Sequence, residues 1–118
     1  MTTASIETPA KFFRDLGGLH DAKVTTLLWD STSASLAIAV DDLNANFRGL
    51  PDYRGQAPGT LSFTGVTRLS MTCDAPNDGP LRIFEVECTS SDAHQSIVLL
   101  LSPHGRVELD CRSVSVES

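Results

Sequence analysis

The sequence lacks the features that mark membrane, secreted and disulfide-rich proteins. Its longest uninterrupted apolar run is the five residues Ile97–Leu101, whereas a membrane-spanning helix needs about 18 to 20. The first seven residues contain neither a basic nor an apolar region, so no signal peptide is expected. The three cysteines include no CxxC pair and do not suggest a disulfide framework. These absences predict a cytoplasmic protein without membrane association.

Positive charge and catalytic motifs are also scarce. The chain has 9 lysines and arginines against 15 aspartates and glutamates, a net charge of −6. An acidic background opposes phosphate contacts and favours encounter with basic proteins, so we expect no nucleic acid and favour a basic protein partner. The sequence contains no P-loop, no GxSxG motif and no histidine pair at metal-ligand spacing. We therefore predict neither a metal nor a cofactor.

The composition predicts one folded domain over residues 1–118, since 41% of the residues are hydrophobic. One short helix is expected at 9–16. Thr8 is a suitable N-cap, Pro9 fits the first helical position, and glycines follow the last expected helical residue. A helix of two turns is too short to be stable alone, so it must pack against the rest of the domain.

From residue 22 to 116 the pattern is that of β-strands. Six strands are expected, over residues 24–29, 36–40, 60–73, 81–89, 94–101 and 106–116. Gly65 interrupts the alternation of the third strand, which indicates a bulge or a bend, and the fourth strand changes phase between Ile83 and Phe84. The prediction is a mainly β fold, a six-stranded antiparallel meander curled into a small barrel or a two-layer sandwich.

A long loop at residues 43–58 fits neither the helical nor the strand period. Long connections inside a compact domain are often functional, and this one carries Phe47, Arg48, Tyr53 and Arg54. Aromatic residues and arginine dominate interface hot spots, so these four are the predicted binding residues. Alternatively, the aromatic side chains fold back as a lid over one end of the β core.

The start of this loop resembles half of a calcium-binding loop. Asp42, Asn44 and Asn46 supply oxygens at alternating positions, but Phe47 stands where the required glycine would be. Capping of a turn by Asp42 and Asn44 is the preferred interpretation.

His20 and Asp21 form a candidate polar site at the entrance to the first strand. A carboxylate beside an imidazole can orient a general base or a metal ligand. In a strand, however, adjacent side chains point to opposite faces, so a structural role at the helix–strand corner is the preferred interpretation.

The remaining polar candidates have simpler interpretations. Cys88 and Cys111 lie in phase with core residues and are expected to be inert. Glu85 and Glu87 are expected on the solvent-facing side of an antiparallel sheet. His94, at a strand end, is expected to be solvated.

The segment from Leu16 to Val24, which reads L-G-G-L-H-D-A-K-V, is followed by Trp29-Asp30 and a strand at 36–40. This opening resembles a loose group of small bacterial β-rich domains with an H-D-A/S-x-V strand entry, including immunity-protein-50-like domains. The resemblance covers about the first 40 residues. It implies a cytosolic, non-catalytic β domain and, for the immunity-like members, toxin binding.

The sequence thus favours a non-catalytic protein-binding module, such as an immunity-like inhibitor. One alternative is a small-ligand carrier with an apolar cavity under the loop at 43–58. Another is an enzyme that uses His20 with a carboxylate of Asp21, Asp41 or Asp42. Unclosed sheets leave edge strands, so a homodimer formed through edge strands is also expected.

Overall fold

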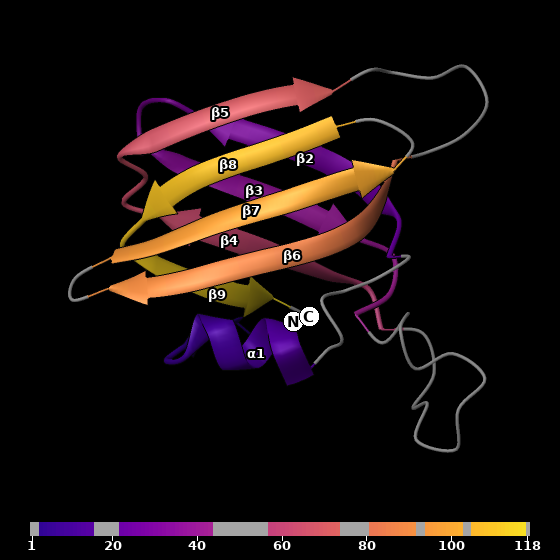
Figure 1. Cartoon of the computed structure of the whole chain (residues 1–118), viewed down its shortest axis with the longest axis horizontal. Helices are drawn as coiled ribbons and strands as arrows, with labels where there is room; N and C mark the ends of the chain where they lie inside the picture. The colour runs from indigo at the N-terminus through magenta and orange to yellow at the C-terminus, as the bar shows by residue number, and fades with distance from the viewer. Residues whose placement is uncertain are drawn as a thin grey trace.

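Two antiparallel sheets packed face to face form the body of the protein (Figure 1). The computed structural model describes residues 3–15, 22–43, 57–73, 81–91, 94–102 and 105–117. Within these ranges the chain forms nine strands and one helix. Their bounds are β1 (Thr3–Ile6), α1 (Pro9–Asp15), β2 (Val24–Asp30), β3 (Ser35–Val40), β4 (Gly59–Thr64), β5 (Arg68–Cys73), β6 (Arg82–Ser91), β7 (His94–Ser102), β8 (Gly105–Cys111) and β9 (Ser113–Glu117).

The strand order gives each sheet two edges. The five-stranded sheet has the order β1-β9-β4-β3-β2, and the four-stranded sheet has the order β5-β8-β7-β6. Figure 1 shows the four-stranded sheet in front, with β5 above β2 on one side and β6 above β9 on the other. Strands β1 and β9 pair directly, which brings the two ends of the chain together.

The core lies between the sheets and follows from the alternation of each strand. Along β3, β4, β7 and β8 the buried residues alternate with less buried ones, because successive strand residues face opposite sides. The buried apolar residues are Phe13, Ala22, Leu36, Ile38, Val40, Leu61, Phe63, Ile83, Ile97, Leu99, Leu101, Val107, Leu109, Cys111 and Val114. Both sheets and the helix therefore contribute to one core.

The helix closes one side of the sandwich. It packs against β6, on the side of the sandwich where β9 lies behind β6 (Figure 1). Phe13 is buried in the core, and its ring meets that of Phe12 edge-to-face with centroids 5.4 Å apart. The N–H of Phe12 donates to the carbonyl of Thr8 at 3.0 Å, which confirms the expected start of the helix.

Two chain segments cross from one sheet to the other at a shared corner. Residues 59–73 form β4 and then β5, while residues 105–117 form β8 and then β9, and the two segments pair in both sheets. Between the last pair of one sheet and the first pair of the other, residues 65–67 oppose only residues 111–112. The extra residue makes a bulge, and Gly65 adopts a left-handed φ of 64°. The bulge or bend predicted at Gly65 is confirmed.

The six-stranded meander was wrong in count and connection. The strands expected at 60–73 and 106–116 are each two strands lying in different sheets, and β1 was not expected. In addition, β9 inserts between β1 and β4, a long-range pairing that a meander does not contain. Over the ranges given above, the sheets form two layers and do not close into a barrel.

The bulge in the fourth expected strand is confirmed at nearly the expected place. The register of β6 against β7 shifts between Ile83 and Glu85, so Phe84 is the extra residue. Glu85 and Glu87 are exposed, as predicted.

Short backbone contacts tie the sheets together at the end where β2 begins. The N–H of Val24 donates to the carbonyl of Leu81 at 2.8 Å, and the N–H of Ile83 donates to the carbonyl of Ala22 at 2.8 Å. These bonds join the start of β2 to the start of β6. The helix, the corner at Gly65 and this junction close three sides of the sandwich.

Candidate functional site

The fourth side of the sandwich is formed by two edge strands. Within the described part of the chain, β2 pairs only with β3, and β5 pairs only with β8. Figure 1 shows these two edges one above the other, on the side opposite α1. An edge strand has backbone N–H and C=O groups that can pair with a further strand. We call this surface, made by β2 and β5, the open side.

Core-facing side chains at the open side are partly exposed. Trp29 pairs with buried Leu36, and Met71 pairs with buried Val107, so both point toward the space between the sheets. Nevertheless, Trp29 is 37% exposed and Met71 is 41% exposed. Their exposure follows from position, because no strand or helix in the described ranges covers the gap between the two edges.

A groove lies where the end of β2 meets the start of β5. It has a volume of about 240 Å³ and is lined by Trp29, Val66, Thr67, Arg68 and Leu69. The corner at Gly65 positions the middle three of these residues, because the N–H of Val66 donates to Ala34 and the N–H of Thr67 donates to Asp110. The lining therefore consists of one tryptophan, two aliphatic residues, one threonine and one arginine.

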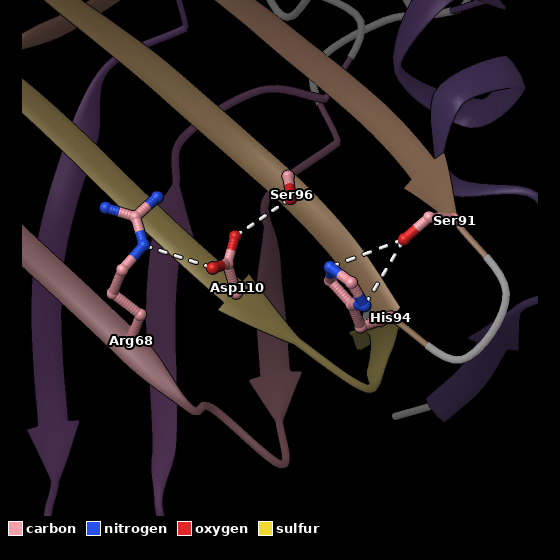
Figure 2. Close-up of polar contacts among 5 residues, drawn as sticks. All are labelled: Arg68, Ser91, His94, Ser96 and Asp110. Carbon is pink, nitrogen blue, oxygen red and sulfur yellow. Dashed lines mark hydrogen bonds and ion pairs between the residues drawn. The ribbon is translucent and has the colours of Figure 1, made fainter.

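Arg68 belongs to a polar row across the outer face of the four-stranded sheet (Figure 2). Its Nε donates to Oδ2 of Asp110 at 3.0 Å, and the hydroxyl of Ser96 donates to Oδ1 of Asp110 at 2.8 Å. Hydrogen bonds from Arg68 and then Ser96 lower the pKa of Asp110, and the bond to Asp110 raises the pKa of Arg68. Asp110 is thus a weakened base with both oxygens occupied.

His94 lies near this row without joining it. The hydroxyl of Ser91 is 3.3 Å from both ring nitrogens of His94, and the charge of His94 contributes slightly to the lowered pKa of Asp110. Over the residues the structure describes, Asp110 hydrogen-bonds to Arg68 and Ser96 and not to His94. A serine–histidine–aspartate relay needs the aspartate to orient the imidazole, and this arrangement does not supply that contact. His94 is exposed, as predicted.

The two described thiols face the core. Cys111 is buried and Cys88 is half-buried, which confirms their predicted phase. Desolvation, with smaller effects of Cys88 and Asp110, raises the pKa of Cys111 to about 11, and burial also raises the pKa of Cys88. Because the thiolate is the reactive form, both thiols are poor nucleophiles at neutral pH.

The predicted binding residues Phe47, Arg48, Tyr53 and Arg54 lie outside the described residues. His20 and Asp21 do as well. The loop prediction and the polar-site prediction therefore stay predictions.

Two carboxylates considered for an enzyme are described, and both serve the backbone. Oδ1 of Asp41 accepts from the N–H of Lys23 at 2.8 Å. Asp42 is buried, and its Oδ1 accepts from the N–H of Ala57 at 3.0 Å. This contact differs from the predicted capping of a local turn, because the partner of Asp42 lies on the other side of the long loop, and Asn44 lies outside the described residues. The sequence reasoning missed the open side, because the phase of Trp29 and Met71 is that of core residues.

Comparison with known proteins supports the fold and gives no family. No protein-family model matches the chain, and no curated protein matches it. A crystal structure of an uncharacterized protein from Neisseria gonorrhoeae is similar, with a TM-score of 0.58 and 10% sequence identity over 100% of this chain and 99% of that chain. At this identity the similarity establishes the two-sheet fold alone. Within the described ranges, no helix has the length and hydrophobicity needed to cross a bilayer.

Proposed function

We propose that the protein is a non-catalytic binding module whose partner is another protein. The observation that supports this proposal is the open side, where apolar side chains that face the core remain partly exposed along two edge strands. Tryptophan and arginine are the residue types most enriched in interface hot spots, and Trp29 and Arg68 both line the groove. An exposed edge beside an apolar groove is the arrangement used for recognition of extended segments.

The chemistry of the described polar groups favours binding over catalysis. Asp110 is held as a carboxylate between two donors, which weakens it as a base. The raised pKa of Cys111 leaves little thiolate at neutral pH. The net charge of −6 favours rapid encounter with a basic partner. An immunity-like inhibitor that binds a basic toxin is the specific form of this proposal, and it rests on the resemblance of the first 40 residues.

Site-specific photo-cross-linking tests the proposal. Benzoylphenylalanine in place of Met71 puts a reactive ketone on the open side, and the same group in place of Leu28 is the control. Leu28 is 66% exposed, but it pairs with Ala37 and faces the outer side of the five-stranded sheet. In cells that produce the protein, we expect position 71 to capture one protein reproducibly and position 28 to capture much less. Equal capture at the two positions would refute binding at the open side.

The loop prediction is tested separately. Replacing Phe47, Arg48, Tyr53 and Arg54 together with alanine should abolish capture at position 71 if the loop and the open side contact the same partner. Undiminished capture would remove these four residues from the interface. Native mass spectrometry tests the carrier alternative, since a bound small molecule would add to the mass of 12.7 kDa.

A further inference from the structure

The two faces of β5 differ in chemistry, and β5 is the edge strand beside the groove. Leu69 and Met71 face the core side, while Arg68, Ser70 and Thr72 face outward. A strand that paired with the free edge of β5 would place its own side chains alternately on the same two faces. The side chains that fit each face therefore define the pattern of the segment that can bind.

On the core side, an added strand would meet apolar surface. Its inward side chains would lie beside Leu69 and Met71 and opposite Trp29 of β2, across the groove of about 240 Å³. Burial of apolar area there is favourable at about 25 cal/mol per Å². Charged side chains would lose hydration there, and Arg68, the charged residue among the described lining residues, pairs with Asp110 on the outer face. The inward positions of the segment should therefore be apolar.

On the outer side, an added strand would lie beside Arg68. Nε of Arg68 donates to Asp110 on the neighbouring strand β8. Figure 2 shows the two Nη atoms on the far side of the guanidinium from this contact, and they make no hydrogen bond to any residue in the described ranges. Two parallel N–H groups match a carboxylate in bidentate geometry. The outward residue beside Arg68 should therefore be Asp or Glu.

Building on the proposed function, we propose that the open side binds an extended peptide segment of the partner as a fifth strand alongside β5. The segment has the pattern apolar–acidic–apolar, with its carboxylate on the Nη groups of Arg68 and its apolar side chains toward Trp29, Leu69 and Met71. A partner can be basic overall and still present one such carboxylate. A second copy of the chain fits this edge less well, because β5 reads Arg-Leu-Ser-Met-Thr-Cys and offers no acid to the Arg68 of its mate.

Selection from random displayed decapeptides tests the pattern. The target is the whole protein, with Met71→Lys as the counter-target, since a lysine there puts charge into the apolar half of the site. We expect enriched sequences with an acidic residue between two apolar residues. No enrichment over the Met71→Lys protein, or enrichment without an acidic residue, would overturn the proposal.

Fluorescence then tests the geometry with a synthetic peptide of the enriched sequence. Trp29 is the single tryptophan, so its emission reports on the groove directly. We expect a shift to shorter wavelength that saturates with peptide. Arg68→Gln should weaken binding about 3- to 10-fold, the range for a partly exposed ion pair or somewhat above it. Methylating the backbone nitrogens of the peptide should abolish binding, because strand addition needs its N–H groups.

Arg106→Gln is the matched control. Arg106 lies on the same outer face and pairs with Glu108, and its side chain is 55% exposed against 56% for Arg68. It is on the inner strand β8 and should leave affinity within twofold of the unaltered protein. Equal losses in the two variants, or unchanged binding of the methylated peptide, would overturn strand addition. So would a dimer at micromolar concentration that the Met71→Lys substitution dissociates. If position 71 still cross-links a protein in these cases, the proposed function stands and only the peptide mode fails.

Discussion

Replacement of Gly65 by alanine should destabilise the protein by about 2 to 5 kcal/mol. Gly65 has a φ of 64°, in the left-handed region, where an L-residue costs about 1 to 2 kcal/mol. A Cβ at this position would lie 2.9 Å from both Cβ and Cγ of Arg112. Because Cβ of Arg112 moves only with the backbone, the corner between the sheets must shift, and overpacking of this kind costs about 1 to 3 kcal/mol.

Urea unfolding followed by Trp29 fluorescence and by circular dichroism measures this cost. With an m-value of about 1.5 kcal/mol per molar urea, the midpoint should fall by about 1.3 to 3.3 M. Arg112→Ala alone should change stability by less than about 0.5 kcal/mol, since Arg112 is exposed. In the Gly65→Ala/Arg112→Ala double variant part of the loss should return, because the contacts with Cγ and Cδ of Arg112 are removed.

Gly105→Ala separates the two contributions. A Cβ at Gly105 would lie 3.1 Å from Cβ of Leu101, which is tight, but Gly105 does not have a positive φ. It should therefore cost less than Gly65→Ala. A Gly65→Ala midpoint within 0.3 M of the unaltered protein would refute the reasoning, and so would a loss no greater than that of Gly105→Ala.

Three further predictions follow from the polar and thiol groups. The pKa of Asp110 is lowered on folding, so its carboxylate stabilises the native state above the usual pKa near 3.8. This contribution is lost as the pH falls through the lowered pKa. The difference in stability between the unaltered protein and Asp110→Asn should therefore be constant near pH 7 and vanish in strong acid. Asp42→Ala should cost about 1 to 3 kcal/mol in urea unfolding because it removes the acceptor of the part-buried N–H of Ala57, and Asp42→Asn, which keeps an acceptor oxygen, should cost less. Cys111 is buried with a pKa of about 11, so an Ellman assay at pH 8 should modify it at a rate that follows global unfolding and rises in the Gly65→Ala variant.

Local sequence patterns predicted most of the strands but not the exchange of strands between sheets. Leu61 and Phe63 share one phase, and Val66 follows three residues after Phe63, as Val114 follows Cys111. A spacing of three residues, in place of two, moves the apolar side chains to the opposite face of the strand. At both places the chain keeps these side chains toward the core because it crosses to the other sheet. The first of these spacings predicted a bulge or a bend within one strand at 60–73, and the second lies inside the single strand predicted at 106–116. Pairing of the two corners depends on residues nearly fifty positions apart, which local periodicity does not contain.

The strand β1 and the insertion of β9 show a second limit. Thr3–Ile6 has only four residues, two polar and two apolar, which is too short a stretch to predict a strand by itself, and it joins the sheet by pairing with β9. On its other side β9 pairs with β4, so β1 enters the sheet through a strand from the opposite end of the chain. Such a strand is a consequence of tertiary pairing and could not be predicted from its four residues.

The open side shows why burial and function could not be separated along the sequence. Trp29 and Met71 alternate with their neighbours as core residues do, and in a closed fold both would be buried. They remain exposed because β2 and β5 are the edges of two sheets on the same side, whereas the opposite side has α1 and buried Phe13. The helix thus covers the core at one side, whereas the core-facing side chains of Trp29 and Met71 remain partly uncovered at the other. A strand from a partner would complete it there, with Arg68 selecting which strand.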